Sequence, residues 1–203
     1  MNDVDRALSQ IEDIQAHLAA STRFRGIAPD LNALTGVFAL AVATAQSLWP
    51  QVLAKDTLGY VVVWASVIFV FAGAVATEAV TRAHQFHGPL AKPMLATALR
   101  KIVPYAAAGV VLTWAICQFA IESAWLLPGI WLILPALAGW SALANLPPAM
   151  IWAVAWYFVS GTAVLAIAGP TGLLSPWMLG LPIGIGQLLV AFILHRADGQ
   201  TNG

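Results

Sequence analysis

The longest uncharged stretch of the chain sets the strongest limit on its fold. Residues 123–195 contain no Asp, Glu, Lys or Arg over 73 consecutive positions. A soluble domain needs charges of both signs spread over its surface, so a run of this length is incompatible with one. Over the whole chain 60% of residues are hydrophobic and 9% are charged, whereas soluble domains carry about 25% charged residues. The sequence therefore predicts an integral membrane protein.

Six apolar segments are long enough to cross a bilayer, which requires a helix of about 20 mostly apolar residues. They cover residues 31–49, 58–79, 102–121, 125–143, 148–168 and 177–194, with proline, glycine and a few charges between them. The predicted fold class is an all-α integral membrane protein. Its two parts are a transmembrane domain of six helices, residues 31–196, and a cytoplasmic amphipathic helix before it, residues 1–24.

Basic residues are distributed unevenly across these spans. One set comprises Arg6, Arg23 and Arg25 before the first span, Arg82, Lys92, Arg100 and Lys101 between the second and third, and Arg196 after the sixth; the opposite side has only Lys55. Because basic residues stay on the cytoplasmic side, both termini and the loop 80–101 are predicted to be cytoplasmic. Trp49, Trp125 and Trp177 then lie at the outer ends of spans, where amphipathic rings prefer to be.

Residues 2–22 show the periodicity of an amphipathic helix. Its apolar stripe consists of Val4, Leu8, Ile11, Ile14 and Leu18, and its other faces carry Asp3, Asp5, Glu12 and Asp13. Helices that lie on a membrane surface are normally rich in Lys and Arg, so this one has the wrong charge for lipid. We expect it to contact protein: the basic loop 82–101 of its own chain, a second copy in a homodimer, or a soluble partner bound through residues 1–20.

The segment 77–93, TEAVTRAHQFHGPLAKP, gathers several polar residues at the end of the second span. Glu78 and Arg82 are spaced i, i+4 and are predicted to pair. If the helix continues to His87, then Gly88 and the proline after it end the helix, and His84 and His87 lie where the helix dipole favours cations. The alternative is that His84 and His87, spaced i, i+3, bind a metal or a haem iron, although two histidines supply only half of a zinc site. No cofactor is predicted, and haem or metal is the alternative.

Inside the spans the polar residues are amides beside small residues. Three such triples share one helix face each: Ala39, Ala43 and Gln46; Ala138, Ala142 and Asn145; Gly180, Gly184 and Gln187. Small residues let helices approach closely and amides hydrogen-bond across the gap, so these faces are predicted to pack helices together. The alternative is a pocket for an apolar ligand lined by Gln187 and Gln118, with Pro182 loosening the sixth helix. The candidate ligand-binding residues are Gln118, Gln187, Glu78 and Arg82.

Several function classes lack any support in the sequence. No phosphate-binding loop, dinucleotide fingerprint, acyl-transfer nucleophile or zinc-protease motif is present, so no catalytic residue is predicted. The net charge is zero, which gives no indication of nucleic-acid binding. The single Cys117 excludes an internal disulfide.

We expect a non-enzymatic membrane protein that binds a protein partner or an apolar ligand in sensing or regulation. A transporter of a small or lipophilic solute is the alternative, and a haem- or metal-dependent membrane enzyme is the second.

The chain also resembles a group of small bacterial six-span membrane proteins. The resemblance rests on Ser21-Thr22-Arg23-Phe24 before the first span, which is similar to the Ser-Ser-Arg-Phe-like motif of that group, and on Leu34-Thr35-Gly36. It continues at Thr81-Arg82, at residues 99–104, and in the glycine-rich last span with His195. Residues 25–30 depart from the usual Ser/Gly run. The resemblance implies a multi-pass protein of the bacterial inner membrane, in a group whose members are sometimes expected beside a winged-helix transcription regulator, and it implies no activity.

Overall fold

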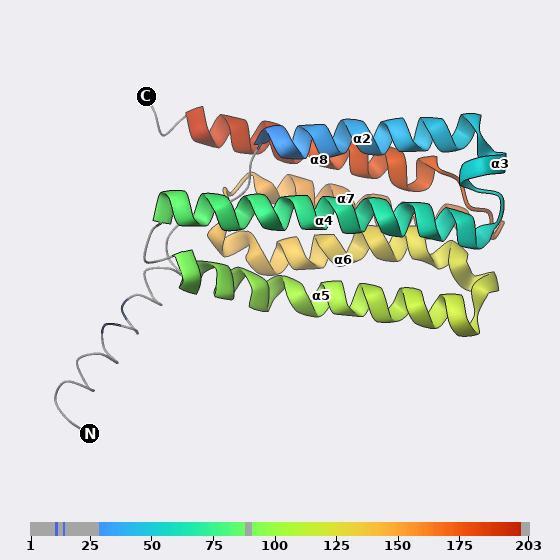
Figure 1. Cartoon of the computed structure of the whole chain (residues 1–203), viewed down its shortest axis with the longest axis horizontal. Coiled ribbons are helices and arrows are strands. Elements are labelled where there is room, and N and C mark those ends of the chain that lie inside the picture. Colours follow the sequence, from blue (N-terminus) through green and yellow to red (C-terminus); the bar gives the residue numbers. More distant parts are fainter. Residues whose placement is uncertain (1–10, 12–13, 15–28, 88–90, 200–203) are drawn as a thin grey trace, which may run out of the picture.

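The computed structural model describes residues 11, 14, 29–87 and 91–199, and these residues form helices joined by short turns, with no strand among them (Figure 1). The elements are α2 (Pro29–Leu48), α3 (Pro50–Leu53), α4 (Thr57–His87), α5 (Ala91–Phe119), η2 (Ile121–Leu126), α6 (Leu127–Ala142), η3 (Leu143–Asn145), α7 (Met150–Ala168) and α8 (Trp177–Gly199). Within the described part of the chain, six helices are long and apolar enough to cross a membrane. For the described residues this confirms the predicted all-α fold and the predicted number of helices of spanning length.

The loop predicted over residues 80–101 is the main error in the helix boundaries. Helix α4 continues to His87 and α5 begins at Ala91, so most of the predicted loop is helical. The reason is that hydropathy marks the part of a helix that fits in lipid, not the point where the helix ends. Residues 95–101 are rich in Ala, Leu, Arg and Lys, which favour helix in water as well. The expectation that the second span continues as helix to His87 is confirmed.

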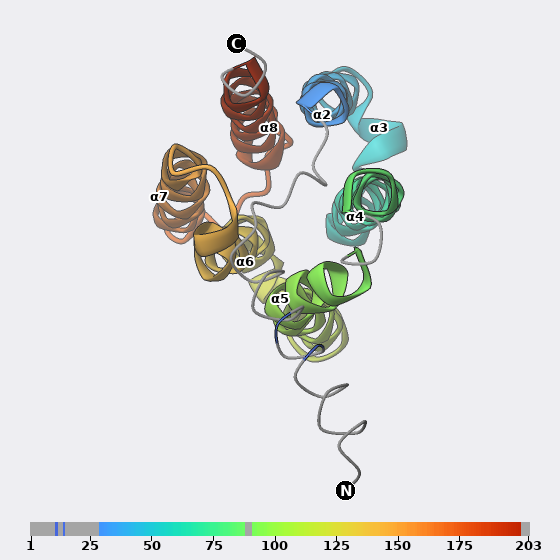
Figure 2. The ribbon, with the colours of Figure 1, turned by 90° about the vertical axis from the view of Figure 1, so that its left-hand side faces the viewer.

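The six long helices form a ring when viewed along their axes (Figure 2). Going round the ring, α2 contacts α8, α8 contacts α7, α7 contacts α6, α6 contacts α5, α5 contacts α4, and α4 contacts α2. The most extensive of these contacts is between α2 and α8. The first and last long helices of the chain are therefore neighbours, and their pairing closes the ring.

Glycines bring α2 and α8 together. A methyl group built on Gly180 would lie 2.2 Å from Cβ of Ala43, and one on Gly36 would lie 2.9 Å from the carbonyl oxygen of Gly184. Ala39 and Ala43 on α2 are completely buried. The packing role predicted for the face with Ala39 and Ala43 and for the face with Gly180 and Gly184 is thus confirmed, and it operates within one chain. Gly180 and Gly184 are buried against α2.

One end of the ring is basic. The end of the ring where α2 begins and α8 finishes also holds the end of α4 and the beginning of α5 (Figure 1). These segments carry the basic residues Arg82, Lys92, Arg100, Lys101 and Arg196, whereas Lys55 follows α3 at the other end. We call the first of these the basic end. At this end Lys101 Nζ donates a hydrogen bond to Oδ1 of Asn145, which ties α5 to the end of α6. The fold therefore keeps the charge asymmetry from which the orientation was predicted.

Candidate functional site: a groove between the first and last long helices

The polar cluster at the end of α4 holds one ion pair. Arg82 Nε donates to Oε1 of Glu78 at 2.6 Å, so the predicted i, i+4 pair is confirmed. Both side chains are half-buried. His84 is exposed, and the side chain of His87 lies outside the described residues. The Glu78–Arg82 pair satisfies its own charges, which gives these two residues a structural reason to be there.

The two glutamines predicted to share a pocket lie on different helices that are not neighbours. Gln118 is exposed on α5, whereas Gln187 is half-buried on α8, with its Cβ close to Gly36 of α2. Helices α5 and α8 do not adjoin in the ring. The structure therefore does not bring Gln118 and Gln187 together, because sequence patterns show which face of a helix is small or polar but not which helix will cover it. Helix α8 also runs unbroken through Pro182, whose carbonyl oxygen accepts a hydrogen bond from Trp156 Nε1 at 2.9 Å.

Gln187 has a polar neighbour that the sequence did not indicate. The ring of Tyr157, on α7, lies against Gly186, and the Tyr157 hydroxyl approaches Gln187. In the described part of the chain, neither the Tyr157 hydroxyl nor Oε1 of Gln187 has a hydrogen-bond partner of good geometry, and both atoms are buried. Buried polar groups in native proteins are nearly always hydrogen-bonded. This pair is therefore a weak point in the packing of α7 on α8.

A second buried glutamine is fully satisfied. Gln46 Nε2 donates to the carbonyl oxygen of Leu53 at 3.0 Å, and its Oε1 accepts from Trp64 Nε1 at 2.8 Å. This network joins the end of α2 to α3 and α4. Nearby, the Tyr60 hydroxyl donates to the carbonyl oxygen of Ser175 at 3.1 Å, which links α4 to the segment before α8. Because both polar side-chain atoms of Gln46 and the Tyr60 hydroxyl are hydrogen-bonded, this end of the ring has the properties of a structural core.

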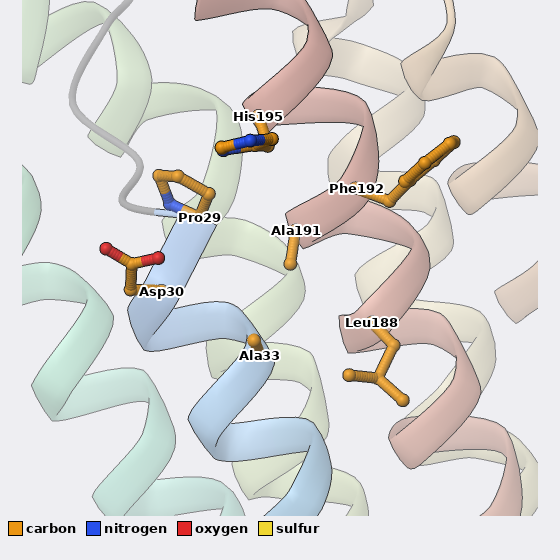
Figure 3. A pocket seen from close by; sticks show the side chains of 7 residues that line it. All are labelled: Pro29, Asp30, Ala33, Leu188, Ala191, Phe192 and His195. Atoms are coloured by element: carbon orange, nitrogen blue, oxygen red, sulfur yellow. The ribbon is translucent and has the colours of Figure 1, made fainter.

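A hollow that combines an apolar wall with free polar groups lies at the basic end, between α2 and α8. We call it the α2–α8 groove (Figure 3). Its lining residues are Pro29, Asp30, Ala33, Leu188, Ala191, Phe192 and His195. Its volume is about 280 Å³, close to the lower limit of roughly 300–1,000 Å³ for small-molecule sites. The close contacts between α2 and α8, at Gly36, Gly180 and Gly184, lie farther from the basic end than the groove does. The two helices are therefore held together beyond the groove, which stays open at the basic end.

The polar groups of the groove are all at one end. Asp30 lies in the first turn of α2 and His195 near the end of α8, while Ala33, Ala191 and Leu188 continue the groove away from them (Figure 3). Among the described residues, neither Asp30 nor His195 has an ion-pair or hydrogen-bond partner. The groove is thus amphipathic: an acid and an imidazole at its mouth, and aliphatic carbon along its length. This arrangement can hold a molecule with a short apolar chain and a polar end.

Sequence reasoning missed this groove, although two signals pointed to it. Asp30 and His195 each stand next to the predicted limit of a span, and both belong to the side predicted to be cytoplasmic. Only the pairing of the first span with the last brings them to the same place, and no pattern in the sequence specified that pairing. Because helices in a bilayer associate through shape rather than through burial from water, hydropathy carries little information about neighbours.

Two earlier expectations concern residues that the structure largely leaves out. In the N-terminal amphipathic segment only Ile11 and Ile14 are described, and both are helical and exposed. The protein contact predicted through residues 1–20 therefore stays a prediction. Within the described ranges, no three His, Cys, Asp or Glu side chains gather closely enough to hold a metal ion. The metal or haem alternative rests on His84 and His87, and the latter side chain is not described.

No protein-family model, curated protein or solved structure matches the chain. The resemblance to small bacterial six-span proteins is therefore an expectation from the sequence, and the functional argument rests on the groove and its residues.

Proposed function

We propose that this chain is a non-enzymatic, multi-pass protein of the bacterial inner membrane that binds a lipid-like amphipathic molecule in the α2–α8 groove. The observation that carries the proposal is the separation of the lining into a polar mouth, Asp30 and His195, and an apolar length formed by Ala33, Leu188 and Ala191. A molecule with the same division of polarity fits such a site without leaving a buried polar group unpaired.

The position of the groove along the helices supports the same proposal. It lies at the basic end, which the positive-inside rule assigns to the cytoplasmic side of the membrane, so both termini would be cytoplasmic. Its polar mouth is then at the level of the lipid headgroups, and its apolar length extends toward the middle of the bilayer. A lipid could enter sideways from the surrounding leaflet without leaving its normal depth.

The rigid contact beside the groove indicates a preformed site. Gly36, Gly180 and Gly184 hold α2 and α8 in close contact next to the groove, with almost no space for an added methyl group. Preformed concave sites bind more tightly than sites that must order themselves, because less conformational entropy is lost on binding. In sensing or regulation, such a site would report on the lipid that occupies it.

The experiment fills the groove and counts retained lipids. The full-length protein is purified in mild detergent, supplied with equimolar dilauroyl-phosphatidylethanolamine and dilauroyl-phosphatidylglycerol, and examined by native mass spectrometry. We expect one lipid, of either headgroup, to remain on the native chain and to be lost from Ala33→Phe and from Leu188→Trp. Ala107→Phe, which enlarges an exposed alanine on α5, is the matched control and keeps the lipid. Equal retention in the native chain and both groove-filling variants would refute the proposal, as would no retention at all.

A further inference from the structure

The polar residues at the mouth of the α2–α8 groove restrict the choice of ligand more than the apolar residues along its length do. We propose that its ligand is a phospholipid whose headgroup ends in a primary ammonium group, as in phosphatidylethanolamine. This inference rests on the proposed function, since it assigns the headgroup of the lipid that the groove binds. The feature behind it is the combination of one carboxylate and one imidazole, both without partners among the described residues, at one end of an apolar hollow.

The Asp30 carboxylate selects for positive charge. It can only accept hydrogen bonds, and hydrogen bonds from a charged donor to a carboxylate are about twice as strong as neutral ones. An anionic headgroup such as phosphatidylglycerol would bring its phosphate toward this carboxylate without a compensating cation of its own. Repulsion between like charges at the edge of a low-dielectric region is larger than in water. The mouth therefore favours a zwitterionic headgroup over an anionic one.

The His195 imidazole distinguishes between zwitterionic headgroups. In its neutral form one ring nitrogen accepts a hydrogen bond, and the ring lies at the same end of the groove as the Asp30 carboxylate (Figure 3). A primary ammonium has three N–H donors, so it can donate to the carboxylate and to the imidazole together. The quaternary ammonium of phosphatidylcholine has no N–H donor and is bulkier. The mouth therefore favours ethanolamine over choline.

A cation stands close by for the phosphate of the same lipid. The guanidinium of Arg196 lies over the ring of Phe192, 4.5 Å from its centroid, a distance typical of cation–π contact. Phe192 lines the groove, and its ring is directed away from α2 (Figure 3). Arg196 is thus held on the α8 side of the mouth, with the negative Asp30 on the α2 side. This separation of charges complements a headgroup whose ammonium meets Asp30 and whose phosphate lies toward Arg196.

The test is a competition between headgroups on the full-length protein. Native mass spectrometry is carried out with equimolar dilauroyl-phosphatidylethanolamine, dilauroyl-phosphatidylcholine and dilauroyl-phosphatidylglycerol. The native chain is expected to retain phosphatidylethanolamine in about tenfold preference, the effect of one charge-assisted hydrogen bond. Asp30→Asn should reduce this preference to about onefold while one lipid is still retained, and Asp30→Glu should keep it. Glu122→Gln, which removes an exposed acid at the opposite end, is the control and should change nothing.

The outcomes separate this inference from the proposed function. One retained lipid without headgroup preference, or a preference that survives in Asp30→Asn, overturns the inference and leaves the lipid groove standing. Retention that does not respond to Ala33→Phe or Leu188→Trp overturns both. A second copy of the chain, in place of lipid, that dissociates when the groove is filled would also overturn both and identify the groove as a dimer contact. If Asp30→Asn proves unstable, loss of preference in His195→Phe decides, and retained preference there counts against the inference.

Discussion

The indole Nε1 of Trp64 donates a hydrogen bond to Oε1 of Gln46 over 2.8 Å, and both side chains are completely buried. The same glutamine donates to the carbonyl oxygen of Leu53, so one amide joins α2, α3 and α4. Contacts between α2 and α4 are otherwise few. The Gln46 network therefore adds hydrogen bonds to the apolar packing of α2 on α4, in which Ala39 and Ala43 share a core cluster with Trp64.

Replacing Gln46 by Leu is expected to destabilise the fold. The change leaves the Trp64 N–H and the Leu53 carbonyl without partners, and an unpaired buried polar group costs about 1–3 kcal/mol. The midpoint of thermal unfolding in mild detergent, followed by near-ultraviolet circular dichroism, should fall by several degrees. Gln118→Leu is the matched control, because it removes an exposed amide, and it should leave the midpoint unchanged. An equal fall in both variants would contradict a specific role for the Gln46 network.

Two glycine-to-alanine substitutions should distinguish the effect of a disturbed helix–helix contact on stability from the effect of helix propensity. Gly180→Ala places a methyl group 2.2 Å from Cβ of Ala43, so α2 and α8 must move apart and the unfolding midpoint should fall. Gly73→Ala on α4 meets nothing within 4 Å, and alanine is favoured over glycine in a helix by about 0.5–1 kcal/mol. Its midpoint should stay the same or rise. If Gly180→Ala behaved like Gly73→Ala, the close α2–α8 contact would be wrong.

Two tyrosine-to-phenylalanine variants should change the stability of the fold in opposite directions. The Tyr157 hydroxyl is buried without a well-formed hydrogen bond, so removing it relieves a desolvated polar group, and Tyr157→Phe should be as stable as the native chain or more so. The Tyr60 hydroxyl donates to Ser175, and Tyr60→Phe leaves that carbonyl oxygen with one donor fewer. We expect this second variant to lose about 0.5–1.5 kcal/mol. Thermal unfolding of both variants, in the same detergent, measures the difference; the reverse order would contradict the assignment of partners.

The orientation in the membrane can be tested by thiol labelling. In a Cys117→Ser background, Gln51→Cys on α3 and Gln85→Cys near the end of α4 place one exposed thiol at each end of the ring without changing any charge. A maleimide that cannot cross membranes should label Gln51→Cys from the outside, whereas Gln85→Cys should react only after the membrane is opened. The opposite pattern would mean that the basic end faces outward, against the positive-inside rule.

The sequence by itself determined the number and the approximate limits of the helices that are long and apolar enough to cross a membrane. Whether a segment can cross a bilayer depends on its own length and apolar composition, which are local properties, and the backbone must then be helical to satisfy its hydrogen bonds. The Glu78–Arg82 pair was predictable for the same reason, since the residues are one turn apart on one helix. The early start of α5, at Ala91, was missed because the limit of hydrophobicity and the limit of a helix are different.

Only the tertiary structure decided which helices are neighbours, and with them the candidate site. Gln46 and Gln118 are the same residue in similar apolar surroundings along the chain, yet the first is completely buried and the second is exposed. Gly180 and Gly184 could have met another copy but meet α2. Asp30 and His195 lie near opposite ends of the chain, and they share a groove only because α2 packs on α8. Inside a bilayer every apolar face is equally soluble in lipid, so the close fit of small side chains selects the partners, and that fit depends on the shape of both helices together.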